Sequence, residues 1–291
     1  MKLITFLHAS QEDRLGALIG DNRVLDIKAC ADHCGATGNF ASTLSVLQDT
    51  DGLKRIRKVI FHSESSNGPW YMPLSDVTIV APIPRPGKIL GAALNYYDFC
   101  ARGNIAVPEK LKVFSKLTNT VIGPNGCVCI EGRNVTYEGE LGVIIGRKGK
   151  KISVENALSY VAGYTIVNDY TANDYVKEDV QLMRGKNLDT FFPMGPVLVT
   201  ADAVPNAGGL DIRTTVNGEL RQDSNTRNLI FTIPQLIEFF SSFLTLEPGD
   251  VIATGTPAGT ALQFNPPAFV KPGDIVEVTI EGLGTLRNSI M

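Results

Sequence analysis

Short apolar runs separated by polar turns dominate the chain, and this pattern predicts strands more often than long helices. Near the N-terminus, residues 4–9 and 15–19 are apolar runs, and a Gly20-Asp21-Asn22 turn leads into a further run at residues 24–27. This arrangement predicts a β-hairpin. Residues 41–60 carry leucines at loosely helical spacing and predict helical structure.

Local signals in the later part of the chain predict strands with few helices. Residues 135–145 and 161–167 are expected to form strands that become buried, with a short helix at residues 152–160 between them. Asn217-Gly218 predicts a tight hairpin turn, because both residues tolerate positive φ. Thr232, followed by Pro234 and Gln235, predicts a helix that begins with a capping box. Two Pro-Gly-Asp turns predict strands at residues 251–253 and 275–278.

Prolines concentrate between residues 69 and 86, where they bias the chain to extended conformations. We place a domain boundary here, which divides the chain into a small N-terminal β-rich domain, residues 1–80, and a larger domain, residues 81–291. Since strands outnumber helices, the expected fold is a β-rich α+β arrangement within the broad α/β class.

Composition narrows the classes of partner. The 291 residues contain 27 Lys and Arg against 30 Asp and Glu, so the net charge is −3. A slightly acidic chain lacks the basic surface that nucleic acid or anionic lipid requires. No apolar stretch approaches the roughly 20 residues of a membrane span, and the N-terminus lacks the pattern of a signal peptide. Five cysteines match no disulfide framework. We expect a cytoplasmic protein with reduced thiols and no nucleic-acid or membrane partner.

Acidic side chains mark the most informative segment of the chain. Glu138 and Glu140 lie two apart on a predicted strand and therefore project from one face, and Asp169 ends another apolar strand. Three oxygen ligands without neighbouring His or Cys favour Mg²⁺ or Mn²⁺ over zinc. On spacing alone, an exposed edge strand whose glutamates pair with Lys or Arg remains an equal alternative.

A family resemblance favours the metal site. Over residues 85–288 the chain resembles the fumarylacetoacetate hydrolase superfamily, and the segment before residue 80 resembles the small N-terminal domain of its bacterial-type members. The order and spacing of seven stretches carry the resemblance: Asn95-Tyr96-Tyr97-Asp98, Tyr137-Glu138-Gly139-Glu140-Leu141, Gly163-Tyr164-Thr165-Ile166-Val167-Asn168-Asp169, Gly185-Lys186-Asn187-Leu188-Asp189-Thr190, Pro193-Met194-Gly195-Pro196, Val216-Asn217-Gly218-Glu219 and Ala253-Thr254-Gly255-Thr256-Pro257.

The resemblance implies a mixed β-roll catalytic domain that forms a homodimer and acts on a small 2-oxo or 1,3-dioxo acid. It also implies that Mg²⁺, or alternatively Mn²⁺, is bound by Glu138, Glu140 and Asp169 and stabilises a metal-bound enolate. The resemblance assigns further site residues. They are Lys186 and Thr256 as catalytic residues, with Asn95, Tyr96, Gly255 and again Thr256 at the substrate.

The chain departs from the family pattern where many members carry a water-activating dyad. Phe99 and Arg102 occupy the positions of the usual His and Glu, and all three histidines precede residue 63. Asn173 and Val176 replace a usual Arg and Gln. Loss of a positioned base typically slows a proton-transfer step by about 10²–10⁴-fold. We therefore expect decarboxylation or tautomerisation (isomerisation), with Arg102 as a substrate carboxylate clamp.

Two alternatives remain open at this stage. One is C–C hydrolysis of an acylpyruvate, with water activated by Glu109, Glu178 or an N-terminal His. The other is a catalytically degenerate scaffold that binds metal and an oxo acid without turnover. The retention of Glu138, Glu140, Asp169 and Lys186 argues against the scaffold.

Overall fold

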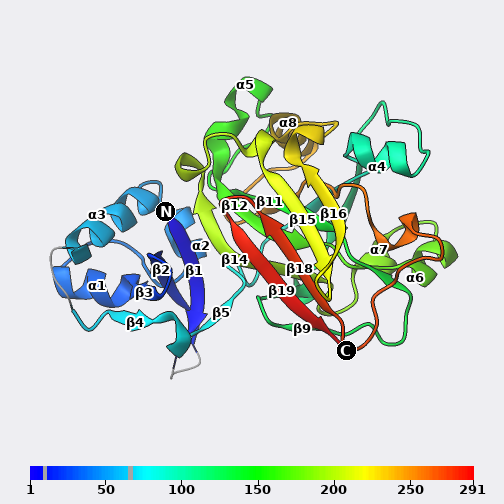
Figure 1. The fold of residues 1–291 in the computed structure, drawn as a ribbon. Helices are drawn as coiled ribbons and strands as arrows, with labels where there is room; N and C mark the ends of the chain where they lie inside the picture. The colour runs from blue at the N-terminus through cyan, green and yellow to red at the C-terminus, as the bar shows by residue number, and fades with distance from the viewer. Residues whose placement is uncertain (9–11, 65–67) are drawn as a thin grey trace.

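The computed structural model describes residues 1–8, 12–64 and 68–291 and consists mainly of two packed β-sheets (Figure 1). The larger sheet has twelve strands: β1 (Lys2–Leu7), β2 (Arg14–Ile19), β3 (Arg23–Asp26), β4 (Tyr71–Pro73), β5 (Thr78–Val80), β6 (Ile89–Ala93), β7 (Lys112–Lys116), β8 (Val121–Ile122), β11 (Gly139–Ile145), β12 (Val161–Asn168), β14 (Phe192–Thr200) and β17 (Val251–Ala253). The second sheet has five: β9 (Cys127–Val128), β15 (Asp211–Val216), β16 (Glu219–Asn225), β18 (Ile275–Ile280) and β19 (Gly284–Ile290). A small ladder joins β10 (Val135–Thr136) to β13 (Thr171–Ala172).

Helices are short and lie around the sheets. They are α1 (Ile27–Cys34), α2 (Thr43–Gln48), α3 (Gly52–Glu64), α4 (Tyr97–Arg102), α5 (Val154–Ala157), α6 (Asn173–Glu178), α7 (Met183–Lys186) and α8 (Ile233–Phe243). Single 3₁₀ turns occur at η1 (Leu74–Asp76), η2 (Thr118–Thr120), η3 (Leu158–Tyr160), η4 (Ala201–Ala203), η5 (Ala207–Gly209), η6 (Thr226–Asn228) and η7 (Ala261–Gln263). Among the described residues, no helix is long and apolar enough to cross a membrane.

Both faces of the larger sheet are covered, which explains why its central strands are apolar at nearly every position. On β11, Leu141 and Val143 belong to a core shared with α8 and the second sheet. Ile144 points to the other face and packs in a core shared with α1 and α3. Figure 1 places α1–α3 on one side of the molecule and α4, α6 and α7 on the opposite side. The expected β-rich α+β fold is confirmed.

The N-terminal strands continue the larger sheet, because β1 pairs antiparallel with β14 and aligns Lys2 with Val199. The predicted hairpin is confirmed as β2 and β3. The predicted strand at residues 4–9 corresponds to β1, and Ala9 lies outside the described residues. The division into domains at residue 80 stays a prediction.

Three predicted elements are interrupted in the structure. The helical structure predicted at residues 41–60 is confirmed as two helices, α2 and α3, because the backbone becomes extended at Asp49 (φ −86°, ψ 122°). The chain then turns back so closely that a Cβ atom on Gly52 would lie 2.0 Å from the carbonyl oxygen of Val46. The strand predicted at residues 135–145 is broken at Tyr137 and Glu138, since β10 pairs with β13 whereas β11 pairs with β12. The helix predicted at residues 152–160 is one α-helical turn followed by one 3₁₀ turn.

Predictions that rest on strongly local sequence signals are confirmed. Asn217 and Gly218 have φ of 52° and 79° at the turn between β15 and β16, as the hairpin prediction requires. Thr232 and Gln235 form the predicted capping box of α8. The strands predicted at residues 161–167, 251–253 and 275–278 are confirmed as β12, β17 and the first part of β18.

Candidate active site

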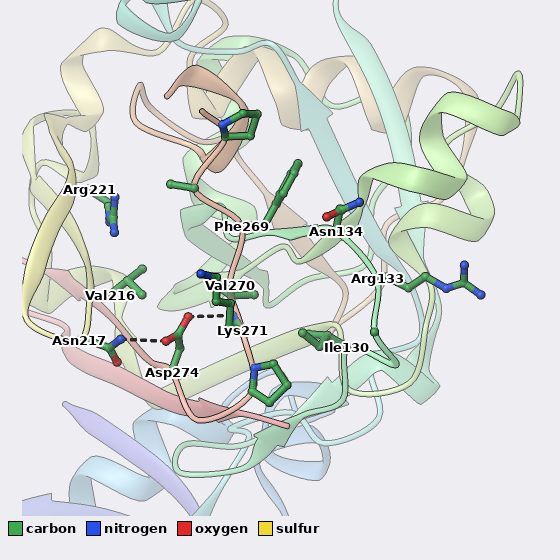
Figure 2. Close-up of a pocket in the computed structure, with 14 residues that line it drawn as sticks. Ile130, Arg133, Asn134, Val216, Asn217, Arg221, Phe269, Val270, Lys271 and Asp274 are labelled. Atoms are coloured by element: carbon green, nitrogen blue, oxygen red, sulfur yellow. Dashed lines mark hydrogen bonds between the residues drawn. The ribbon is translucent and has the colours of Figure 1, made fainter. Parts of the chain in front are cut away.

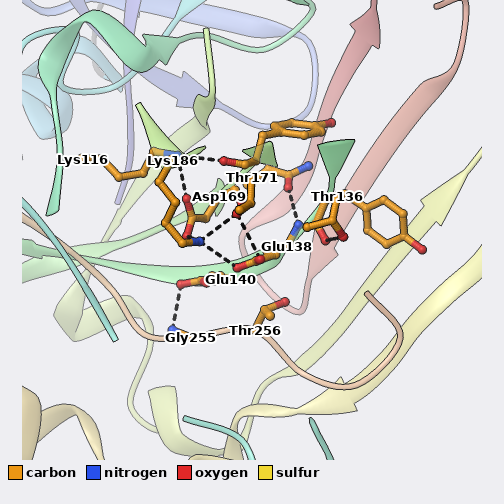
Figure 3. Close-up of polar contacts among 12 residues, drawn as sticks. Lys116, Thr136, Glu138, Glu140, Asp169, Thr171, Lys186, Gly255 and Thr256 are labelled. Carbon is orange, nitrogen blue, oxygen red and sulfur yellow. Dashed lines mark hydrogen bonds and ion pairs between the residues drawn. The ribbon is translucent and has the colours of Figure 1, made fainter. Parts of the chain in front are cut away.

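Antiparallel pairing of β11 and β12 brings three carboxylates together (Figure 3). Gly139 aligns with Asn168, so Glu138 lies opposite Asp169 just beyond the ladder. The Asp169 N–H donates to the Glu138 carbonyl at 2.9 Å. Opposed residues point to one face, and Glu140 shares that face because it lies two residues further along. Carboxylate oxygens of the three residues lie within 4.8 Å of one another.

Glu140 is fixed by the loop that follows β17. Its Oε2 accepts a 2.7 Å hydrogen bond from the Gly255 N–H, and the residue is 1% exposed. Gly255 has φ of +100°, and a Cβ atom there would lie 2.8 Å from the Cβ of Asn95. A glycine is therefore needed for the loop to approach the carboxylate this closely.

Two buried lysines contact the carboxylates from one side (Figure 3). Lys186, at the end of α7, forms an ion pair with Asp169 and donates to Glu138 at 3.2 Å and to Thr171 Oγ1 at 2.9 Å. Lys116, at the end of β7, donates to Asp169 Oδ1 at 2.6 Å and is fully buried. The Nζ of Lys116 also donates to the carbonyls of Tyr170 and Phe191, at 3.1 and 2.8 Å.

Burial and mutual repulsion shape the protonation of this cluster. Burial raises the pKa of Glu138 and raises that of Glu140 further above its ordinary value, where the Asp169 and Glu138 charges add to the effect. Burial lowers the pKa of Lys116 to about 8. Burial also opposes the charge on Lys186, but the facing carboxylates outweigh it and raise the pKa of this lysine.

The donor set fits a divalent cation. Three carboxylates and two ammonium groups leave one negative charge uncompensated. Four of these groups are buried and the Glu138 side chain is 19% exposed, so this charge is unfavourable without a further cation. All three carboxylates offer hard oxygen atoms, and no nitrogen or sulfur ligand belongs to the cluster that the structure describes. Glu138, Glu140 and Asp169 are therefore the residues that would hold the ion.

A cavity of about 190 Å³ opens beside the carboxylates. Glu138, Glu140, Lys186 and Thr256 line its polar part. Its remaining wall is mostly apolar and includes Leu94, Phe99, Phe114, Val176, Leu182 and Leu262. Three positions at which the chain departs from the family pattern, Phe99, Asn173 and Val176, line this cavity. The departures thus change the wall of the cavity beside the carboxylates directly.

The predicted substrate-binding residues lie at different depths. Thr256 faces the cavity, and its Oγ1 donates to the Gly139 carbonyl at 2.9 Å. The Asn95 amide is buried and bonds to the backbone of Thr254 and Phe231. The Tyr96 hydroxyl is buried and has no hydrogen-bond partner among the described residues. Contacts of Asn95 and Tyr96 with substrate stay predictions.

Arg102 and the proposed alternative bases lie away from the cavity wall. The exposed Arg102 guanidinium stacks on Phe264, 4.7 Å from the ring centroid. Glu109 is exposed, and Glu178 is exposed and paired with Arg184 at 2.7 Å. No histidine lines the cavity in the described part of the chain.

Sequence reasoning missed Lys116 and Gln222. Lys116 follows two other lysines in residues 110–116, and no local signal distinguishes it, because its burial is created by residues 169–191. Gln222, on β16, is buried and accepts from the Gly139 N–H at 3.0 Å. Its position on an inward-facing site of a predicted hairpin was the only available signal.

A larger cavity of about 540 Å³ lies elsewhere, between the β15–β16 turn and the segment that leads into β18 (Figure 2). Its carboxylate, Asp274, accepts from Asn217 Nδ2 and from the Lys271 N–H, both at 2.8 Å. Glu138 and Glu140 do not line this larger cavity; they line the smaller one described above.

Comparisons with known proteins agree with this geometry. Residues 88–291 match the family model described as fumarylacetoacetate (FAA) hydrolase C-terminal. The chain is 40% identical over 288 residues to oxaloacetate tautomerase YisK of Bacillus subtilis (strain 168), covering 95% of each chain. It is 41% identical over 223 residues to the mitochondrial oxaloacetate tautomerase Fahd2a of Rattus norvegicus, covering 76% of this chain and 71% of the relative.

A solved structure extends the likeness to the whole chain. Maleylpyruvate hydrolase from Sphingobium sp. SYK-6, in complex with manganese(II) and pyruvate, has a TM-score of 0.80 and 31% identity, covering 100% of this chain and 99% of that one. The buried carboxylate cluster and this family of relatives together indicate use of a divalent metal ion. The chain belongs to the fumarylacetoacetate hydrolase superfamily of enzymes.

Proposed function

We propose that the enzyme interconverts the keto and enol forms of oxaloacetate, with Mg²⁺ as its metal ion. The observation that carries this proposal is Phe99 at the cavity wall, where the family resemblance expects a water-activating His. Tautomerisation moves a proton between carbon and oxygen and needs no attacking water. The relatives from Bacillus subtilis and Rattus norvegicus, both named oxaloacetate tautomerase, support the assignment.

The charged residues at the cavity have two roles in this proposal. Glu138, Glu140 and Asp169 hold the cation, which supplies a Lewis acid to the 2-oxo group when bound. Lys186 keeps its proton, and it exchanges its hydrogen bond to Thr171 for one to the substrate oxygen on which negative charge develops, because its three N–H donors are otherwise used by Glu138, Asp169 and Thr171. The contacts of Lys186 with the Glu138 and Asp169 carboxylates fix its ammonium group in place before the substrate arrives.

The apolar wall supports the same reaction by restricting water. Phe99, Phe114 and Val176 line the cavity next to the charged groups. Electrostatic interactions strengthen where water is excluded, so the Lys186 ammonium acts more strongly on the developing negative charge. The same wall disfavours hydrolysis, which requires a water molecule beside a base.

The direct test follows the decay of enol oxaloacetate by its ultraviolet absorbance, while a lactate dehydrogenase assay detects any pyruvate. We expect metal-dependent acceleration of enol–keto conversion without pyruvate release. Lys186→Met should slow conversion by about 10²–10³-fold, as loss of an oxyanion donor does. Lys177→Met, an exposed lysine on α6, is the matched control. No acceleration with either Mg²⁺ or Mn²⁺ would overturn the proposal.

Decarboxylation and C–C hydrolysis are the competing reactions of the same site. Decarboxylation of oxaloacetate shares the enolate and would appear as pyruvate in the coupled assay. Hydrolysis is favoured by the likeness to maleylpyruvate hydrolase and would yield pyruvate and a second acid from an acylpyruvate. A scaffold without turnover would bind metal and oxalate but convert none of these substrates.

Arg102 is proposed to bind the distal carboxylate of oxaloacetate. Its place at the end of α4, the helix that carries Phe99, supports this role, since only its stacking on Phe264 would have to be released. Arg102→Ala should raise KM for oxaloacetate with little change in kcat. Unchanged KM would remove Arg102 from the proposed site.

We also propose that the enzyme is a cytoplasmic homodimer. The family resemblance supports the dimer, and the match to a bacterial relative over 95% of both chains supports the location. Light scattering coupled to size-exclusion chromatography and subcellular fractionation would test the two statements separately.

A further inference from the structure

The peptide groups around Gly139 are held by two side chains from other parts of the fold. Gly139 lies between the predicted metal ligands Glu138 and Glu140. Its N–H donates to Gln222 Oε1 at 3.0 Å, and its carbonyl accepts from Thr256 Oγ1 at 2.9 Å. Gln222 Nε2 donates in turn to Thr256 Oγ1 at 2.8 Å. The two side chains thus form a closed set of hydrogen bonds, which we call the Gly139 clamp.

The Gly139 clamp connects β11, the strand that carries Gly139 and Glu140, to the second sheet. Gln222 lies on β16, is fully buried and also donates to the Pro257 carbonyl at 2.9 Å. A Cβ atom on Gly139 would lie 2.4 Å from Thr214 Oγ1 and 2.8 Å from Val278 Cγ1. Because Gly139 has no side chain, β11 can approach the second sheet closely enough for the Gln222 amide to reach its backbone.

We propose that Gln222 is a positioning residue for the metal site. The Gly139 N–H belongs to the peptide that joins it to Glu138, and its carbonyl belongs to the peptide that joins it to Glu140. Fixing both peptides sets the directions in which the two carboxylates leave the backbone. Gln222 does not line the cavity, so it acts through Gly139 and Thr256 rather than on the substrate. This inference rests on the metal site of the proposed function.

The test measures binding of Mn²⁺ to the full-length protein by isothermal titration calorimetry, with no substrate present. Gln222→Leu removes all three hydrogen bonds of the amide and should weaken Mn²⁺ affinity by about 10–100-fold, as loss of an outer-sphere partner does. Asn288→Leu is the matched control on the same sheet, because Asn288 is also buried and donates to the carbonyls of Gly123 and Gly126, both at 3.0 Å. This variant should lose comparable thermal stability and keep its Mn²⁺ affinity.

The possible outcomes distinguish failure of the Gln222 role from failure of the metal site in the proposed function. Unchanged Mn²⁺ affinity in folded Gln222→Leu, or an equal loss in Asn288→Leu, would overturn the positioning role alone. Absence of Mn²⁺ binding in the unmodified protein would overturn the metal site and this inference with it.

If Gln222→Leu does not fold, Thr256→Val and Thr256→Ser decide the question, since only the serine keeps the hydroxyl that donates to Gly139. Weakened affinity in the valine variant and retained affinity in the serine variant would support the clamp, and equal affinities would refute it.

Discussion

Replacing Glu140 by Gln should stabilise the metal-free protein and abolish its stabilisation by metal. Glu140 is 1% exposed, and burial together with the neighbouring carboxylates raises its pKa well above 4.5. Its charge is therefore unfavourable in the folded protein without metal. Glutamine has the same shape, and its amide oxygen can still accept the hydrogen bond from Gly255.

The charges of the site explain why the variant should lose metal binding, and the metal concentration relative to Kd sets the size of the stabilisation in the unmodified protein. Three carboxylates and two lysines give a net charge of −1, which a divalent cation converts to +1. After Glu140→Gln the corresponding charges are 0 and +2, so binding is strongly disfavoured. At a metal concentration 100 times Kd, binding stabilises a protein by about 2.7 kcal/mol. With roughly 2–4 °C per kcal/mol for chains of this size, Tm of the unmodified protein should rise by roughly 5–10 °C.

Differential scanning fluorimetry in EDTA and in Mg²⁺ measures both effects. A carboxyl whose pKa is raised in the folded state binds more protons there than in the unfolded state, so stability falls as pH rises above 4.5. The Tm advantage of metal-free Glu140→Gln should therefore widen with increasing pH. Glu238→Gln, on the exposed side of α8, is the control and should change neither Tm nor the metal shift. A variant that retains the full metal shift, or melts at a lower temperature in EDTA at neutral pH, would refute the reasoning.

Three further substitutions or treatments test other parts of the structure. Gly139→Ala should lower stability by about 1–3 kcal/mol through overpacking, and adding Thr214→Ala should recover part of the loss in urea unfolding. No recovery would mean that the contact with Thr214 is not the cause. Phe99→His combined with Arg102→Glu rebuilds the dyad of the resemblance and should introduce acylpyruvate hydrolysis, measured as pyruvate release; an unchanged rate would show that the dyad alone is insufficient. Burial raises the pKa of the Cys30 thiol to about 11, so this thiol should resist alkylation at pH 8 in the folded protein and react after unfolding, as peptide mass mapping would detect.

Elements with strong local signals could be predicted from the sequence, whereas their interruptions could not. Asn217-Gly218 and Thr232 act through bonds within a few residues, so their turn and cap follow from the local sequence. The break at Glu138 depends on which distant strand each half joins, β13 or β12. Apolar periodicity describes the faces of a strand but does not name its partners.

The candidate site likewise combines residues that the sequence predicts with residues that only the structure identifies. Spacing predicts that Glu138 and Glu140 share a face, but Asp169 was brought to them through strand pairing over some thirty residues. Lys116 lies at the end of β7, 53 residues before Asp169, and is distinguished only by the burial that the fold creates. Its identification therefore required the structure.

Pairing between β1 and β14 has a consequence for synthesis on the ribosome. The first strand aligns Lys2 with Val199, so its partner is made only after almost two hundred further residues. At about 5–20 residues per second this delay is roughly 10–40 s. The nascent chain can close the β1–β2 hairpin early and can pair Thr5–Leu7 with β5 once residue 80 is made, but Lys2 and Leu3 on that same edge stay without their β14 partner during that interval. Unpaired edges are templates for aggregation, so early pairing with β5 shortens the edge of β1 that is exposed until β14 is made.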